Sequence, residues 1–122
     1  MTIIDDSYNS NPISSKSALD TLSEFDGTKI IVTPGLIELG ENEKTYNFEF
    51  GQYMAKICDY IFLVGNTQSK SILDGINSKQ FDKKKTFNVA SPQDAIKQIL
   101  DLKINGDITV LLENDLPDNY NL

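Results

Sequence analysis

The sequence of 122 residues contains no arginine, no histidine and no tryptophan, and it has a single cysteine. Without arginine, no guanidinium group can hold a phosphate or a carboxylate through two parallel hydrogen bonds. Without histidine, the chain has no imidazole base or imidazole metal ligand, and Ser-His-Asp and Cys-His catalytic sets are excluded. One cysteine without histidine also excludes the usual zinc sites. Any contact with an anion must therefore use lysine, hydroxyl, amide or backbone N–H groups.

The sequence also lacks the glycine-rich motifs that hold nucleotide phosphates. Neither G-x-x-x-x-G-K-[ST] nor G-x-G-x-x-G occurs in the chain. In these motifs the glycines let the backbone approach the phosphates closely. We therefore expect that this chain does not hold a nucleotide in either of the two usual ways.

Positive charge and long apolar segments are scarce. The chain carries 11 lysines against 18 acidic residues, a net charge of −7, which argues against nucleic acid and against an anionic membrane as partners. No apolar run approaches the length of a membrane span, and no signal peptide is visible. Cys58 has no partner for an internal disulfide and is expected to be a small buried hydrophobe. These features favour a protein of the reducing cytoplasm.

What the sequence does contain is an alternation of strand and helix patterns in a chain of single-domain length. Five short apolar runs alternate with four segments of helical spacing; the runs cover residues 3–4, 29–32, 60–64, 86–89 and 108–112. Three of the runs are nearly continuous, which is typical of strands buried on both faces of a parallel sheet. We therefore predict a Rossmann-like three-layer αβα sandwich with a mainly parallel sheet of five to six strands.

Two of the helices have clear start signals. Asn11 is a plausible N-cap ahead of Pro12, and Ser91 precedes Pro92 in the same way. The second helical segment has the strongest apolar stripe, formed by Tyr46, Phe50, Tyr53, Met54 and Ile57. The fourth helix is expected to bury Ala95, Ile96, Ile99 and Leu100.

Ligands of open α/β sheets bind beyond the carboxyl ends of the strands, and the first such loop is rich in polar residues. Asp5 and Asp6 suit a metal, a cation or the capping of a turn, while the amides of Asn9 and Asn11 suit peptide or base contacts. The N-terminus of the following helix suits an anion. A purely structural alternative remains, in which Asn11 only caps the helix and the acids only satisfy turn N–H groups.

The second loop, residues 33–40, is rich in glycine. Gly35 and Gly40 permit a positive φ and a close approach of the backbone. Glu38 is either a charge close to a helix or a polar contact at the edge of the sheet, and both readings stay open.

The first loop resembles a family signature. Residues 5–12, DDSYNSNP, followed by Lys16 and Leu22, resemble the D-D-x-Y-N-A-N-P motif in the C-terminal domain of the Mur ligases. The resemblance is closest to the branch that adds D-alanyl-D-alanine to UDP-N-acetylmuramoyl-tripeptide. Residues 37–40, IELG, and a helix expected to end at Gly51 resemble the family's L-E-L-G segment. The chain departs from that branch at residues 34–36 and 112–117, which leaves the amino-acid acceptor unassigned.

The resemblance implies that residues 1–122 are the third, C-terminal domain of a longer chain. Its other parts would be a UDP-sugar-binding domain and a central ATPase domain, which would hold most of the ATP and Mg²⁺. Such an enzyme is an ATP-dependent ligase of peptidoglycan precursor synthesis. It phosphorylates the carboxylate of a UDP-MurNAc-peptide, and the amine of an amino acid or D-alanyl-D-alanine attacks the acyl phosphate. The C-terminal domain carries this small-molecule amine and closes on the nucleotide.

The resemblance also assigns roles to residues at matching positions, and it implies no catalytic or metal-binding residue in this domain. The nucleotide or the inter-domain hinge would be faced by Asp6, Tyr8 and Asn9. The acceptor side of the cleft would be formed by Asn11, Gly35, Glu38 and Gly40.

Two other functions fit a domain of this size and fold. A non-catalytic Rossmann-like binding module requires no ATPase domain in the parent protein. A response-regulator receiver would also have an acid pair after the first strand. It would further need an aspartate at the end of the third strand and a lysine after the fifth, where this chain has Gly65-Asn66 and Leu112-Glu113.

Overall fold

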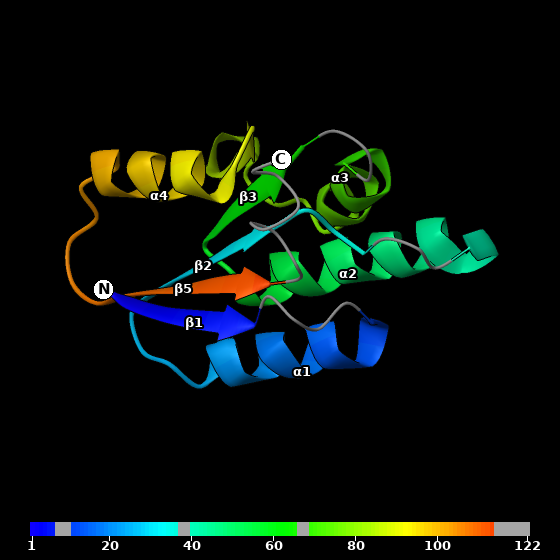
Figure 1. Ribbon diagram of the computed structural model, residues 1–122, viewed down its shortest axis with the longest axis horizontal. Helices are drawn as coiled ribbons and strands as arrows, with labels where there is room; N and C mark the ends of the chain where they lie inside the picture. The colour runs from blue at the N-terminus through cyan, green and yellow to red at the C-terminus, as the bar shows by residue number, and fades with distance from the viewer. Residues whose placement is uncertain (7–10, 37–39, 66–68, 114–122) are drawn as a thin grey trace.

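The computed structural model describes residues 1–6, 11–36, 40–65 and 69–113, and these form an α/β fold around one parallel sheet (Figure 1). The elements are, in order, β1 (Thr2–Asp6), α1 (Pro12–Ser23), β2 (Thr28–Thr33), η1 (Gly40–Asn42), α2 (Glu43–Ile57), β3 (Tyr60–Val64), α3 (Ser69–Ser78), η2 (Lys83–Lys85), β4 (Thr86–Val89), α4 (Pro92–Asp101) and β5 (Ile108–Glu113).

All the strand pairs of the sheet are parallel, in the order β1-β5-β2-β3-β4. The last strand in the sequence therefore lies between the first two. Since parallel strands all end at the same edge, the carboxyl ends of β1, β5 and β2 lie next to one another there. The prediction of a Rossmann-like, mainly parallel sheet is confirmed, with five strands among the described residues.

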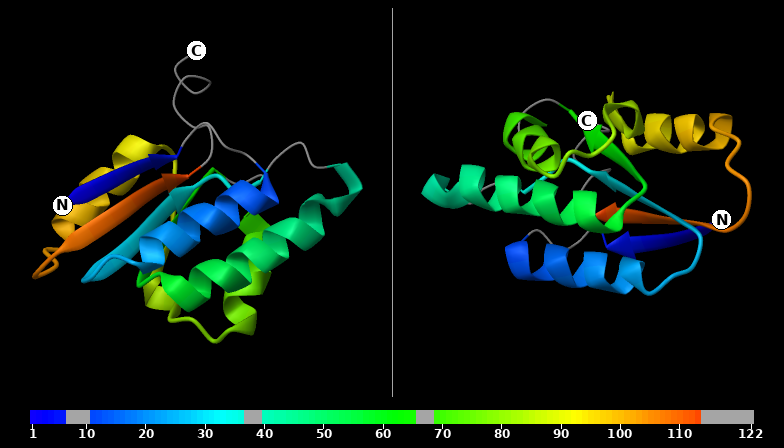
Figure 2. Two further views of the ribbon diagram at one scale, coloured as in Figure 1. Left: turned by 90° about the horizontal axis from the view of Figure 1, so that it is seen from below. Right: turned by 180° about the vertical axis from the view of Figure 1, so that it is seen from behind.

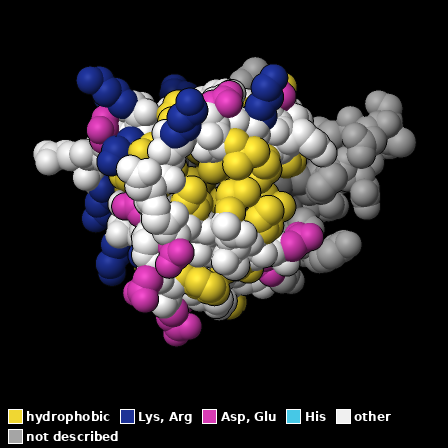
Figure 3. Space-filling view, turned by 90° about the vertical axis from the view of Figure 1, so that its left-hand side faces the viewer, with side chains coloured by type: hydrophobic (Ala, Val, Ile, Leu, Met, Phe, Trp, Pro, Cys, Tyr) yellow, Lys and Arg dark blue, Asp and Glu magenta, His cyan; other side chains and the backbone are white. Residues whose placement is uncertain are grey.

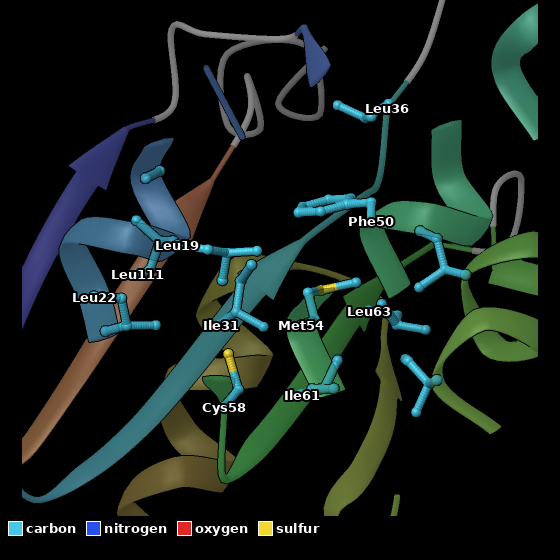
Figure 4. Packing of buried hydrophobic residues seen from close by; sticks show 13 residues of the cluster. Leu19, Leu22, Ile31, Leu36, Phe50, Met54, Cys58, Ile61, Leu63 and Leu111 are labelled. Atoms are coloured by element: carbon cyan, nitrogen blue, oxygen red, sulfur yellow. The ribbon is translucent and has the colours of Figure 1, made fainter. Parts of the chain in front are cut away.

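Helices cover both faces of the sheet, which gives the predicted three layers (Figures 1 and 2). Residues of α1, α2 and α3 pack on one face, and α4 packs on the other. The larger core lies on the first of these faces, where side chains from α1, α2, β2, β3 and β5 point toward one another (Figure 4). Leu19, Met54 and Ile61 are completely buried in it, and Cys58 is buried as expected.

The predicted helix starts are confirmed. Asn11 accepts a hydrogen bond through Oδ1 from the N–H of Ser14 at 2.9 Å, with Pro12 as the first residue of α1. Ser91 accepts in the same way from the N–H of Asp94 at 3.1 Å. Each cap satisfies one of the N–H groups that a helix leaves without a partner.

Two predictions about the helices are wrong. α2 does not end at Gly51 but continues to Ile57. Gly51 is explained by packing instead, because Gly51 and Gly75 lie where α2 and α3 touch. A Cβ on Gly51 would lie 2.3 Å from the Ile72 carbonyl oxygen, and one on Gly75 would lie 2.0 Å from that of Phe48. The glycines therefore allow contact between two backbones.

Leu100 is not buried; 61% of its surface is exposed. α4 contacts the sheet through residues including Ala95 and Ile99, and Leu100 lies one position round the helix from Ile99. Figure 3 looks onto the side where β1 begins and α4 ends, and hydrophobic side chains gather there. The exposed hydrophobic residues in and next to these segments are Met1, Ile3, Leu100 and Leu102.

Among the helices that the structure describes, none has both the length and the apolar composition of a membrane span.

Candidate functional site

The first predicted loop joins the end of β1 to the start of α1. Asp5 is exposed, while Asp6 is half-buried and lines a small pocket of about 280 Å³ together with Ser14 and Ser17 of α1. The two acids point to opposite faces of the sheet because side chains alternate along a strand. Asp6 therefore belongs to the α1 side. The predicted residues Tyr8 and Asn9 lie outside the described residues.

The second loop leaves β2 through a turn that the side chain of Thr33 closes. Gly35 has a φ of +87°, and its N–H donates to Oγ1 of Thr33 at 3.0 Å. Gly40 has a φ of +63° and begins η1. Both glycines thus adopt the left-handed region that was expected of them. Glu38 lies outside the described residues.

Asn47 of α2 holds the entry to the second loop, and the sequence reasoning missed it. Its Oδ1 accepts from the Leu36 N–H at 2.8 Å, and its Nδ2 donates to the carbonyl oxygens of Leu36 and Glu43, both at 2.9 Å. Asn47 is completely buried, and both its amide oxygen and its amide nitrogen form hydrogen bonds. The sequence does contain a signal for this role, because the polar Asn47 lies on the buried stripe of α2 with Phe50 and Met54.

Glu113, the last residue of β5, lies between the carboxyl ends of β1 and β2. It is in register with Asp6 of β1, and its other neighbouring strand is β2. Its carboxylate accepts at Oε2 from the hydroxyl of Ser15 and at Oε1 from the hydroxyl of Thr33 at 2.7 Å. The side chain is completely buried. One carboxylate therefore connects β5 to α1 and to β2.

Burial raises the pKa of Glu113 to about 7 from its usual 4.5. The loss of water around the charged form is the main cause; the hydrogen bonds from Ser15 and Thr33 act in the opposite direction, and the charge of Asp6 raises the pKa further. Buried carboxyls whose pKa lies near neutrality are concentrated at functional sites. Sequence reasoning placed Glu113 only at the start of a loop.

A groove of about 710 Å³ runs between α1 and α2, and its lining includes Pro12 at the start of α1. In this groove the ammonium groups of Lys16 and Lys56 lie 5.4 and 5.8 Å from the centre of the Tyr53 ring, within the range of a cation–π contact. The Tyr53 hydroxyl donates to Asp20, and this hydrogen bond raises the pKa of Tyr53. The groove thus combines aromatic surface with charges of both signs.

The structure brings Asp6, Asn11 and Gly35 to the carboxyl edge of the sheet, where Glu113 connects the elements that carry them. Gly40 lies at the far end of the second loop, at the start of η1. Among the described residues, no three Asp, Glu or Cys side chains come together as a metal site. The arrangement is suited to binding and positioning.

Comparisons with known proteins agree with this fold. The chain is 37% identical over 87 residues to a UDP-N-acetylmuramoyl-tripeptide--D-alanyl-D-alanine ligase of Buchnera aphidicola, covering 70% of this chain and 19% of the relative. It is 29% identical over 112 residues to the ligase of that name from Bacillus subtilis, covering 88% and 24%. The chain thus spans about a fifth to a quarter of the length of these relatives.

A crystal structure of MurF ligase from Thermotoga maritima in complex with ADP has the same fold, with a TM-score of 0.68 and 23% identity over 93% of this chain and 25% of that chain. The family model described as "Mur ligase, glutamate ligase domain" matches residues 1–113. That range includes both loops and ends at Glu113. The resemblance seen in residues 5–12 and 37–40 is thereby confirmed, and the chain belongs to the Mur ligase family.

Proposed function

We propose that residues 1–122 are the C-terminal domain of a longer, cytoplasmic, ATP-dependent ligase of peptidoglycan precursor synthesis. This enzyme joins the carboxylate of a UDP-MurNAc-peptide to the amine of an amino acid or of D-alanyl-D-alanine. The observation that carries the proposal is the 37% identity with a relative named as the D-alanyl-D-alanine-adding ligase. The proposal thus assigns the activity named for that relative to the longer protein of which this chain would be a part.

The proposed reaction requires an activated carboxylate, which ATP supplies as an acyl phosphate. The incoming amine forms a new C–N bond, the C–O bond to phosphate breaks, and the amine gives up a proton as phosphate leaves. This chain has no phosphate loop, and its described residues contain no cluster suited to Mg²⁺. We therefore assign ATP and Mg²⁺ mainly to the central domain of the parent.

The contribution of this domain is to hold the incoming amine and to exclude water when it closes on the nucleotide. Orienting two reactants removes much of the entropic part of a barrier, and exclusion of water protects an acyl phosphate from hydrolysis. Asp6, Tyr8 and Asn9 are assigned to the nucleotide or the hinge. The acceptor side is assigned to Asn11, Gly35, Glu38 and Gly40. The placement of Asp6, Asn11 and Gly35 at the carboxyl edge of the sheet supports this.

The proposal is tested by assaying the full-length parent with ATP, Mg²⁺ and a UDP-MurNAc-tripeptide, with D-alanyl-D-alanine or single amino acids as acceptors. Mass spectrometry should detect a new amide product that forms together with ADP. The isolated 122-residue chain should neither hydrolyse ATP nor form the amide. A parent that ligates none of these acceptors, or a parent gene without a phosphate-loop domain, favours a non-catalytic binding module instead.

Asp6→Ala in the parent tests the role of the first loop, and Asp5→Ala is a matched control. We expect Asp6→Ala to lower kcat/KM for ligation by about tenfold or more, equivalent to ~1.4 kcal/mol of transition-state stabilisation. Its thermal midpoint should change little. Asp5 is an exposed acid on the same strand whose side chain points to the other face, so its loss should lower kcat/KM much less than the loss of Asp6. If Asp6→Ala lowers stability and ligation in proportion, the residue is structural.

A further inference from the structure

Three neighbouring strands, β1, β5 and β2, each carry a polar side chain at their last residue. Asp6 of β1 is in register with Glu113 of β5, and Thr33 ends β2 on the other side of Glu113. All three lie on the face that α1 covers, since Glu113 also contacts Ser15 of α1. Thr33 and Glu113 are both completely buried. The end of β5, between Asp6 and Thr33, is thus occupied by a buried carboxylate rather than by an apolar residue.

The carboxylate connects α1 to the end of β2 through separate oxygens. Oε2 accepts from Ser15, which lies in the first turns of α1, directly after the first loop. Oε1 accepts from Thr33, whose hydroxyl oxygen in turn accepts from the N–H of Gly35 in the second loop. A chain of hydrogen bonds therefore runs from α1 through Glu113 to the backbone of the second loop.

Only the ionised carboxylate can accept from both hydroxyls in this arrangement. A neutral carboxyl donates its own hydrogen to one hydroxyl, which then accepts instead of donating, and both hydrogen bonds weaken because neither is charge-assisted any longer. The pKa of Glu113 is raised to about 7, so both forms are populated near neutral pH. Among the described groups around it, Asp6 of β1 supplies the nearby charge, whereas α1 and β2 supply the neutral hydroxyls of Ser15 and Thr33.

We propose that Glu113 is a positioning residue that, when ionised, holds the start of α1 and residues 33–36 firmly in the geometry that binds the incoming amine, and that holds them less firmly when it is protonated. The inference rests on the proposed ligase function for its consequence in catalysis. The connection between α1 and residues 33–35 through Glu113 is itself independent of that function. Glu113 does not touch the reacting atoms in this proposal; it acts through Ser15 and Thr33.

The experiment measures kcat and KM for the amine in the full-length parent, across a pH range that brackets the pKa of about 7. In the unmodified parent, kcat/KM should rise as Glu113 ionises. Glu113→Gln, which is neutral at every pH and nearly equal in size, should lack this rise. Above neutral pH it should be about tenfold less active, the size of one lost hydrogen bond to a charged group. Glu24→Gln, an exposed acid after the end of α1, should keep the profile of the unmodified parent.

Thr33 variants separate positioning from simple destabilisation. The hydrogen bond from Thr33 lowers the pKa of Glu113, so Thr33→Val should move the inflection of the profile to higher pH. Thr33→Ser keeps the hydroxyl and should leave the inflection in place. A profile of Glu113→Gln that coincides with that of the unmodified parent, or an inflection that Thr33→Val does not move, overturns the inference.

Hydrogen exchange distinguishes failure of this inference from failure of the proposed function. In the parent without substrates, the peptide that contains Gly35 should exchange faster in Glu113→Gln than in the unmodified protein above neutral pH. The two should exchange equally at low pH, where both side chains are neutral. Equal exchange at every pH overturns the inference even if the parent is a ligase. A parent that does not ligate, but shows the exchange difference, overturns only the proposed function.

Discussion

The buried Glu113 makes the stability of this chain depend on pH in a direction opposite to that of a paired surface acid. Its pKa is about 7 in the folded chain, against a usual value of 4.5. The folded state therefore binds the proton more tightly than the unfolded state. The stability gained from this proton is complete below pH 4.5 and is lost as the pH rises through about 7.

The size of the effect follows from the distance between the two pKa values. Each pH unit between them corresponds to about 1.4 kcal/mol, so the ionised carboxylate lowers the free energy of unfolding by about 3 kcal/mol at high pH. Glu113→Gln removes the titration and keeps the volume. The difference in stability between Glu113→Gln and the unmodified chain should rise by about 3 kcal/mol in favour of the variant between the acid and alkaline limits.

Urea denaturation of the 122-residue chain, followed by circular dichroism at a series of pH values, measures this difference. Carboxylates distant from Glu113 contribute the same pH dependence to both proteins, so their contribution cancels in the difference. The exposed Glu24→Gln serves as the control, and its difference from the unmodified chain should stay within about 0.5 kcal/mol. A difference for Glu113→Gln that does not change with pH, or that changes in favour of the unmodified chain as the pH rises, refutes the reasoning.

Three further predictions concern stability and reactivity. Gly75→Ala should lower the free energy of unfolding by about 3 kcal/mol or more in the same urea assay, because its Cβ would meet the Phe48 carbonyl. Gly40→Ala is the control: the space around its Cβ is open, so it should lower the free energy of unfolding by only about 1–2 kcal/mol through backbone strain. Asn47→Leu should cost about 3 kcal/mol, since the N–H and carbonyl of Leu36 lose their partners, and a cost under about 1 kcal/mol contradicts this. Burial raises the pKa of the Cys58 thiol, so a disulfide reagent should modify it only in urea; fast modification of the folded chain contradicts this.

The sequence allowed the order of elements and the helix starts to be predicted, because those signals are local. Asn11 and Ser91 cap their helices as short-range rules require. The two errors have non-local causes. Gly51 resembles a helix end in the sequence, and only its contact with α3 in the folded structure explains the glycine. Leu100 is apolar and has helical spacing, but it lies beside the surface of α4 that is buried against the sheet.

The candidate site was predicted only in part. Of the predicted residues, Asp6, Asn11 and Gly35 lie at the carboxyl edge of the sheet, and this placement follows from parallel strands alone. The importance of Glu113 depends on the strand order, in which β5 lies between β1 and β2, and no local pattern encodes that order. Asn47 is different, because a polar residue on the apolar stripe of α2 is visible in the sequence. Such a residue indicates a buried hydrogen-bond network.

The position of Glu113 has a stability cost that an apolar residue would avoid. A buried charge is unfavourable unless hydrogen bonds compensate it, and here the hydrogen bonds from Ser15 and Thr33 compensate only in part, since the pKa stays high. A hydrophobic side chain would fill the same space without connecting Ser15 to Thr33. In a domain proposed to orient an amine, the connection serves positioning, because a loop displaced by about 1 Å can lower a rate about 100-fold. The cost in stability and the proposed pH dependence of the connection between Ser15 and Thr33 therefore have one physical origin, the incomplete compensation of a single buried carboxylate.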